Sequence, residues 1–276
     1  MTDQFANIQG ARIRYRDSGG RGPAVLMTHG IGESLEFWQR QFEASDLPAR
    51  LIAWDMPGHG LSEELDSAID LQGQAQVAWQ LLDHLGIGQV ILVGNSLGAA
   101  MSLQMVAQAA TRVRGLLLAN AAALGQEVFT PFRIMSLPFL GELMNRPGPA
   151  AVERQIQAIV LRPDAITPEV RTAIVRNLNR PGAGHHFLRL LRQLTHWRGQ
   201  RDAVWRRSHE ILRSVKAPTV IMHGEQDMVL PVQHSRAAHL VLPAAELVVL
   251  QNCGHTPQLE QPIAFNEQLA NLIARA

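Results

Sequence analysis

The stretch from Gln89 to Ala99 places the strongest constraint on how this chain can fold. It begins with the aliphatic run Val90–Val93, which is typical of a strand buried on both faces of a parallel sheet. The run ends in Gly94-Asn95-Ser96-Leu97-Gly98, whose two glycines allow a strand to turn sharply into a helix without Cβ clashes. This pattern predicts that Ser96 stands at the end of the strand with an exposed hydroxyl. An ordinary glycine-flanked turn is the alternative interpretation.

The composition is that of a globular enzyme. The 276 residues are 46% hydrophobic and 18% charged, and the formal net charge is +1. A near-neutral balance gives no reason to expect nucleic acid or a membrane as the main partner. The single cysteine excludes a framework of intrachain disulfides. Residues 1–10 lack the basic and apolar segments of a secretory signal, so we expect a cytoplasmic protein.

Strand-like and helix-like segments alternate through most of the chain. Phe5–Gln9 and Arg12–Arg16 predict an antiparallel hairpin at one edge of a sheet. Ser34 and Asp70 are the expected N-caps of two following helices, and Asp55 is expected to brace a Pro-Gly turn by accepting backbone N–H groups. Further buried strands are predicted at residues 24–28, 51–54, 113–119, 217–223 and 245–250. The alternation predicts an α/β fold with a mostly parallel central sheet of about eight strands and helices on both faces.

A long insertion interrupts this alternation. Residues 123–212 contain no convincing strand, and prolines separate their helical stretches. We therefore predict an all-helical cap over residues 123–212 and a core domain formed by residues 1–122 and 213–276. The cap has 13 arginines and 7 acidic residues (13 − 7 = +6), while the rest has 12 basic and 17 acidic residues (12 − 17 = −5). Solvated arginine-rich helix faces are the simplest explanation of this asymmetry.

Three candidate catalytic residues each follow a predicted strand. Ser96, Asp227 and His255 would meet at the carboxyl edge of a parallel sheet, which is where ligands bind in such folds. A serine hydroxyl needs a base to take its proton, and the base works best when an acid fixes its tautomer. Glu225 is an alternative to Asp227 as the acid.

A second turn is expected beside the same edge. His29-Gly30-Ile31-Gly32 ends a strand, and its glycines let the backbone approach a ligand closely. A tight turn around a hydrogen-bonded core histidine is the alternative. The pair His185-His186 has no companion Cys, Asp or Glu at ligand spacing, so we expect neither a metal nor a cofactor.

The order of these motifs resembles that of the α/β-hydrolase fold superfamily, and the resemblance extends over nearly the whole chain. The motifs are His29-Gly30-Ile31-Gly32, Asp55-Met56-Pro57-Gly58-His59-Gly60, Gly94-Asn95-Ser96-Leu97-Gly98, Gly224-Glu225-Gln226-Asp227 and Gly254-His255. The resemblance implies a serine hydrolase in which Ser96 attacks an acyl carbon, His255 takes the proton and Asp227 orients His255.

The same resemblance implies an oxyanion hole and a substrate site. The amides of Ile31 and Leu97 would hold the oxyanion, and Gly30 and Asn95 would contact the substrate. The serine at position 96 differs from the aspartate of the related dehalogenases and epoxide hydrolases, which argues against those reactions.

The substrate class has more than one interpretation. A small carboxylic ester, cleaved through an acyl-enzyme, is the favoured one. Gly-Asn-Ser also resembles the hydrolases that cleave C–C bonds in 2-hydroxy-6-oxo-dienoate products of aromatic ring fission. Those enzymes usually have a tryptophan after the catalytic histidine and Gly-Pro-Gly after the first His-Gly, where this chain has Thr256 and Gly32-Glu33-Ser34. Thioesterase, lactonase, amidase and non-enzymatic binding are further alternatives.

Two arginines of the cap are candidates for substrate binding. Arg189 and Arg192 share a predicted helix with His185 and His186. An arginine on the inner face of the cap would bind a substrate carboxylate through paired N–H groups. We therefore expect a small-molecule substrate, which an anionic compound would suit. The sequence is also compatible with a homo-oligomer.

Overall fold

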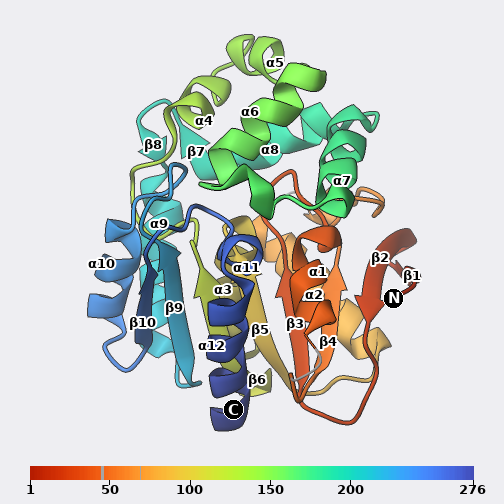
Figure 1. Cartoon of the computed structure of the whole chain (residues 1–276), viewed down its shortest axis with the longest axis vertical. Helices are drawn as coiled ribbons and strands as arrows, with labels where there is room; N and C mark the ends of the chain where they lie inside the picture. The colour runs from red at the N-terminus through yellow and green to blue at the C-terminus, as the bar shows by residue number, and fades with distance from the viewer. Residues whose placement is uncertain (45–46, 69) are drawn as a thin grey trace.

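The computed structural model describes residues 1–44, 47–68 and 70–276. Within these ranges the main element is an eight-stranded sheet with the strand order β1-β2-β4-β3-β5-β6-β9-β10 (Figure 1). Its strands are β1 (Gln4–Ile8), β2 (Ala11–Asp17), β3 (Ala24–Thr28), β4 (Arg50–Trp54), β5 (Val90–Asn95), β6 (Val113–Ala119), β9 (Thr219–Gly224) and β10 (Glu246–Leu250). All pairs from β4 to β10 are parallel, and β2 joins β1 and β4 in antiparallel fashion. The predicted fold class and edge hairpin are thus confirmed.

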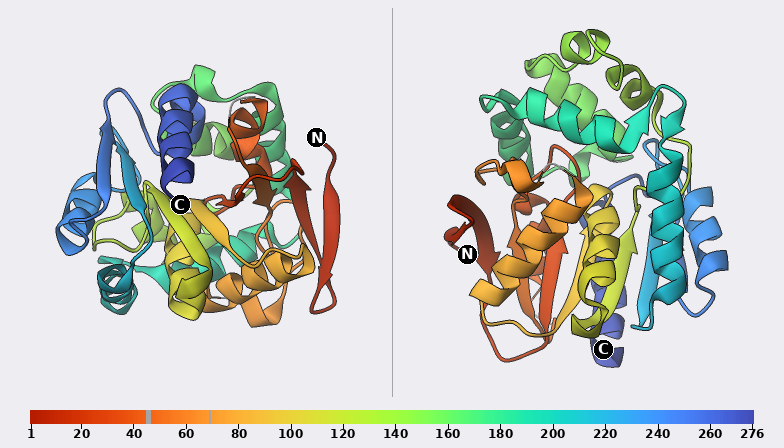
Figure 2. Two further views of the ribbon diagram at one scale, coloured as in Figure 1. Left: turned by 90° about the horizontal axis from the view of Figure 1, so that it is seen from below. Right: turned by 180° about the vertical axis from the view of Figure 1, so that it is seen from behind.

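Helices pack against both faces of the sheet, as Figure 2 shows in the view from below. One core lies between the sheet and the helices α2 (Leu71–His84), α3 (Leu97–Ala109), α9 (Asp202–Ser214) and α10 (Gln233–Val241). The other core lies beneath α12 (Pro262–Arg275) and the 3-10 turn Leu35–Trp38, which leads into α1 (Gln39–Glu43). Because the central strands β3 and β5 are buried from both sides, their sequences are mostly apolar. None of the helices formed by the described residues has the length and apolar composition needed to cross a bilayer.

The two predicted helix caps have different outcomes. Asp70 caps α2 as expected, because its side chain accepts a hydrogen bond from the Gly73 amide at 2.8 Å. The prediction for Ser34 is wrong, since its side chain caps no helix and instead donates to Glu36 Oε2 at 2.6 Å. A nearby carboxylate is a stronger acceptor for the hydroxyl, so Ser34 joins a polar network instead of a helix end.

The insertion forms a cap over the carboxyl edge of the sheet (Figure 1). Its helices are α4 (Thr130–Met135), α5 (Leu140–Met144), α6 (Pro149–Ile159), α7 (Pro168–Asn179) and α8 (Ala183–Leu194). The prediction of an all-helical cap is wrong, because β7 (Thr195–His196) and β8 (Gly199–Gln200) form a short antiparallel pair. The cap also ends before residue 212, since Ile211 and Leu212 of α9 are buried in the main core.

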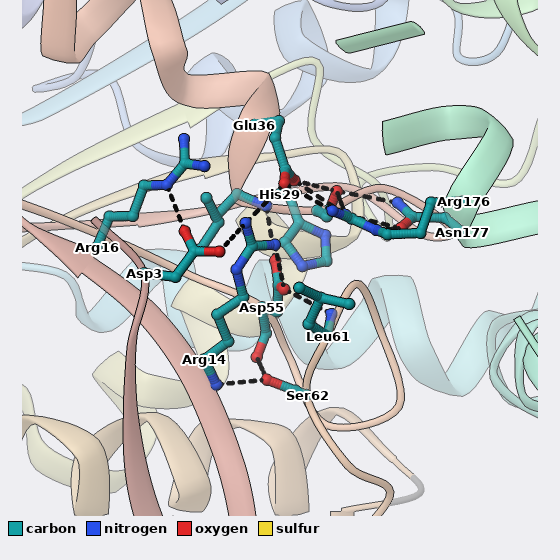
Figure 3. Close-up of polar contacts among 12 residues, drawn as sticks. Asp3, Arg14, Arg16, His29, Glu36, Asp55, Leu61, Ser62, Arg176 and Asn177 are labelled. Atoms are coloured by element: carbon teal, nitrogen blue, oxygen red, sulfur yellow. Dashed lines mark hydrogen bonds and ion pairs between the residues drawn. The ribbon is translucent and has the colours of Figure 1, made fainter. Parts of the chain in front are cut away.

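A buried network of charges joins the core to the cap (Figure 3). Arg14 of β2 donates to Asp55 Oδ2 at 3.0 Å and to Glu36 Oε1 at 2.7 Å. Arg176 of α7 donates to both oxygens of Glu36, at 2.9 and 3.1 Å. Asp55 also accepts the amides of Leu35 and Leu61, at 2.7 and 2.8 Å, so its predicted bracing role is confirmed. The edge hairpin, two core loops and the cap therefore share one set of charges.

We predict that Glu36→Ala destabilises the protein strongly. The substitution leaves the buried Arg14 guanidinium with fewer carboxylate partners and removes the carboxylate to which Arg176 donates. Breaking one partner of a buried ion pair costs about 3 kcal/mol, to be measured as the free energy of unfolding in urea. Glu153→Ala is the matched control, since it breaks the exposed pair with Arg171 and should leave the midpoint nearly unchanged. Equal midpoints for both variants would contradict the structural role of the network.

Candidate active site

Ser96 occupies the sharp turn between β5 and α3 that the sequence predicts. Its backbone has φ 55° and ψ −115°, a strained conformation for a residue with a side chain. A Cβ on Gly94 would lie 2.4 Å from the backbone of Gly98, and a Cβ on Gly98 would lie 2.2 Å from the Thr28 carbonyl oxygen. The turn therefore tolerates only glycine at both positions, and it fixes Ser96 beside the end of β3.

Asp227 and His255 form a direct contact. His255 Nδ1 lies 2.8 Å from Asp227 Oδ2, the arrangement in which a carboxylate fixes the tautomer of an imidazole. The other oxygen of Asp227 accepts the amides of Val229 and Leu230, at 2.7 and 3.1 Å. The alternative acid, Glu225, makes no such contact and lies 4.0 Å from the exposed Arg236. The geometry thus favours Asp227 as the partner of His255.

The charges of the pair shift both pKa values. Burial would raise the pKa of Asp227, but His255 and the hydrogen bonds from His223 and His255 hold it well below its usual range. Burial would lower the pKa of His255, but the charge of Asp227 and their hydrogen bond raise it above its ordinary value. Asp227 is consequently a carboxylate at neutral pH.

Two contacts fix the loop that carries His255. The His255 amide donates to the Ile159 carbonyl at the end of α6, at 3.1 Å. Asn95 Nδ2 donates to the His255 carbonyl oxygen at 3.0 Å and to the Ala119 carbonyl oxygen at 3.3 Å. Asn95 is completely buried and does not line the cavity described below, which corrects the expectation that it contacts the substrate. Its amide instead positions the loop of His255.

A cavity of about 390 Å³ opens above these residues, and Ile31, Ser96 and His255 line its floor. Its walls are mostly apolar, with Phe129, Phe132, Met135, Phe187, Met228 and Val229 among the lining residues. Such a cavity, mostly apolar with a few polar groups, is typical of a site for a small molecule. Leu97 is the first residue of α3, so its amide has no acceptor within the helix.

The remaining expected substrate contacts lie elsewhere. Gly30 does not line the cavity, and its amide donates to Glu33 Oε2 at 2.7 Å. Arg192 donates to the Ser136 and Leu137 carbonyl oxygens, each at 3.2 Å, and pairs with Glu142 at 2.9 Å. Neither Arg189 nor Arg192 is among the residues that line the cavity. The expectation that these two arginines face the substrate is therefore corrected.

Two polar residues at the site were missed by the sequence analysis. Asn120 Nδ2 donates to Asp227 Oδ2 at 2.7 Å and to the Gly254 carbonyl oxygen at 3.0 Å. Its position directly after a predicted buried strand was the available signal. Glu33 is buried and lines the cavity together with His255. No sequence pattern distinguishes Glu33 from an ordinary loop acid, because only the folded turn buries it.

Burial raises the pKa of Glu33 to about 7, although His255 and the Gly30 amide act in the opposite direction. When ionised, Glu33 adds to the negative charge around His255, as Glu260 does to a smaller extent. The protonation of His255 is thus linked to two carboxylates that line or border the site, in addition to Asp227. Among the described residues, no group of three His, Cys, Asp or Glu side chains could hold a metal ion.

We predict that Glu33→Gln lowers the pKa of His255. The amide keeps the shape of the side chain but removes its charge, so protonated His255 loses stabilisation and the imidazole stays neutral to lower pH. NMR titration of the ring protons measures this shift directly. Glu225→Gln, in the loop of Asp227, is the control and should leave the titration unchanged. Superimposable curves for Glu33→Gln and the wild type would contradict the coupling.

Comparison with known proteins agrees with this geometry. Residues 25–268 match the model of the "Alpha/beta hydrolase family". An uncharacterised protein of Mycobacterium tuberculosis is 32% identical over 273 residues, which cover 96% of this chain and 79% of that protein. A 2-hydroxy-6-oxononadienedioate/2-hydroxy-6-oxononatrienedioate hydrolase of Pseudomonas sp is 26% identical over 267 residues, covering 95% and 92%.

A solved structure with the same fold is that of a thermophilic esterase from Thermogutta terrifontis with malate bound. It superposes with a TM-score of 0.77 at 22% identity, covering 100% of this chain and 99% of that one. The strand order of the sheet, the turn at Ser96 and the match over residues 25–268 all indicate the same family. The chain belongs to the alpha/beta hydrolase family.

Proposed function

We propose that this protein hydrolyses a small carboxylic ester through an acyl-enzyme formed on Ser96. The observation that carries the proposal is the 2.8 Å contact between His255 Nδ1 and Asp227, in a histidine that shares the cavity floor with Ser96. This contact leaves Nε2 as the nitrogen that can accept a proton. A serine, a histidine and a buried carboxylate in these roles are the groups that acyl transfer requires.

The proposed reaction has two halves. In the first, Ser96 Oγ attacks the ester carbonyl, His255 Nε2 takes the serine proton and then gives it to the departing alkoxide. In the second, His255 takes a proton from water, the resulting hydroxide attacks the acyl carbon, and the proton returns to Ser96 as the acid leaves. The amides of Ile31 and Leu97 are the proposed donors to the oxyanion in both halves. Besides the ester and one water molecule, the groups in these steps are side chains and backbone amides of the chain.

C–C bond hydrolysis of a ring-fission dienoate is the second candidate, favoured by the name of the 26% identical Pseudomonas relative. Two contacts of this chain weigh against it. Thr256, which stands where those enzymes usually carry tryptophan, is buried and donates to the Ile159 carbonyl at 3.1 Å. Asn95 is engaged by backbone carbonyls. Both side chains are buried, and their donor groups bond to backbone carbonyl oxygens.

The proposal predicts that Ser96→Ala and His255→Ala each abolish most esterase activity. Each should lower kcat for p-nitrophenyl butyrate by a factor on the order of 10⁴ to 10⁶, and the double variant should be little worse, because the residues act as a unit. A ring-fission dienoate is assayed in parallel. Faster turnover of the dienoate than of every ester in a panel would favour the second candidate, and additive losses would contradict the shared role.

The assignment of Asp227 as the acid predicts a smaller loss of activity that is specific to Asp227. Asp227→Asn keeps the size of the side chain but no longer stabilises the protonated imidazole, so kcat should fall roughly 10²- to 10⁴-fold. Glu225→Gln is the matched control from the same loop and should have little effect. Steady-state kinetics with one ester compares the two variants. A larger loss in Glu225→Gln than in Asp227→Asn would show that the wrong acid was assigned.

A further inference from the structure

Segment 123–212, which includes the cap and most of α9, carries an excess of positive charge that its own acidic residues do not neutralise. All seven acidic residues of segment 123–212 have a basic partner. Five pair with arginines of the same segment, namely Glu142, Glu153, Asp164, Asp202 and Glu210. Glu127 contacts His234, and Glu169 pairs with Arg16. The segment has 13 arginines, so several of them have no acidic partner within it.

Two of these arginines line the cavity above Ser96. They are Arg146, between α5 and α6, and Arg154 on α6. Within residues 1–44, 47–68 and 70–276, neither side chain forms an ion pair, whereas the neighbouring Glu153 is already held by Arg171 at 2.7 Å. The cavity therefore presents two cationic groups beside walls that are mostly apolar.

The packing of α6 turns Arg154 towards the cavity. Ala151, Arg154, Gln155 and Ala158 line the cavity from one helix face, and Gln157 and Ile159 near the end of the helix line it as well. Val152 and Ile156 belong to a different face, which is buried in a cluster with Val170 and Ile174 of α7. Figure 1 shows α6 between α5, at the top of the cap, and the sheet below.

The same helix sets the distance between Arg154 and the catalytic histidine. The last residue of α6, Ile159, accepts the His255 amide at 3.1 Å. Arg154 precedes Ile159 by five residues, which corresponds to about 7.5 Å along the helix axis. A ligand that reaches both Ser96 and Arg154 must therefore carry its anionic group several bonds from the reacting carbonyl.

The segment that carries Arg146 is also fixed. Asn145 Nδ2 donates to the Gly184 carbonyl of α8 at 3.0 Å. Pro147 follows Arg146 and restricts its backbone, and Pro149 begins α6. Arg146 is thus presented from a defined position, which lowers the entropy lost when it binds a ligand.

We propose that Arg146 and Arg154 bind a carboxylate of the substrate while its scissile ester lies at Ser96. This inference rests on the proposed esterase function and narrows its substrates to monoesters of linear dicarboxylic acids. Guanidinium groups suit carboxylates because they offer paired N–H donors in one plane. Both arginines remain exposed to solvent, so their contribution to the binding free energy of the substrate is moderate.

The test compares two esters that differ only in charge. They are the mono-p-nitrophenyl ester of octanedioic acid and the same compound with its free carboxylate methylated. The wild type should prefer the anionic ester, and Arg146→Ala/Arg154→Ala should lower kcat/KM for it about 10-fold while leaving the methylated ester unchanged. Arg189→Ala is the matched control, because it removes a cap arginine that does not line the cavity.

Three outcomes would overturn the inference. They are unchanged kinetics in the double variant, an equal loss for both esters, and the same selective loss in Arg189→Ala. A binding measurement separates this inference from esterase function. The probe is monomethyl octanedioate, titrated calorimetrically into Ser96→Ala protein with and without the two arginine substitutions. A 10-fold weaker Kd in the substituted protein supports the subsite even if no ester is hydrolysed, and equal Kd values overturn it.

Discussion

The close approach of backbones at the carboxyl edge of the sheet is the constraint on which this site depends. A Cβ on Gly98 would meet the Thr28 carbonyl oxygen, and one on Gly224 would lie 2.0 Å from the Gly254 carbonyl oxygen. The first contact seats the serine turn against β3, and the second seats the histidine loop against β9. Because parallel strands end at the same edge, these two contacts bring residues more than a hundred positions apart in the chain into one cavity.

The cap completes this arrangement, and both α7 and the end of α6 fix it to the core. Through α7, Arg176 reaches Glu36 and shares the buried charges of Arg14 (Figure 3). Through the end of α6, the Ile159 carbonyl accepts the amide of His255 and the hydroxyl of Thr256. The position of His255 is consequently linked to the helix that carries Arg154. The position of the cap therefore affects both the orientation of His255 and the shape of the cavity.

The sequence predicted what depends on local chemistry and could not predict what depends on distant packing. Apolar runs identified the parallel strands, and Asp70 capped its helix as expected, because both signals act within a few residues. Ser34 failed as a cap because Glu36, Arg176 and Asn177 surround its hydroxyl in the folded chain. The pairing of Asp227 with His255 was expected from strand order, whereas its coupling to Glu33 required the fold.

The arginines of the cap illustrate the same limit. The helical spacing of Arg189 and Arg192 was compatible with an inward face, but Arg192 is occupied by the α4–α5 connection and by Glu142. Charge counting correctly located an excess of positive charge in the insertion. Only the packing of α6 against α7 decides that Arg154 lines the cavity.

Covalent labelling shows whether Ser96 is an activated nucleophile. The protein is treated with phenylmethylsulfonyl fluoride and analysed by intact-mass spectrometry and peptide mapping. An activated Ser96 should give one adduct per chain, located on Ser96, and no adduct in Ser96→Ala protein. An adduct on another serine, or an unmodified wild type under conditions that label a control serine hydrolase, would contradict the assignment of Ser96 as the nucleophile.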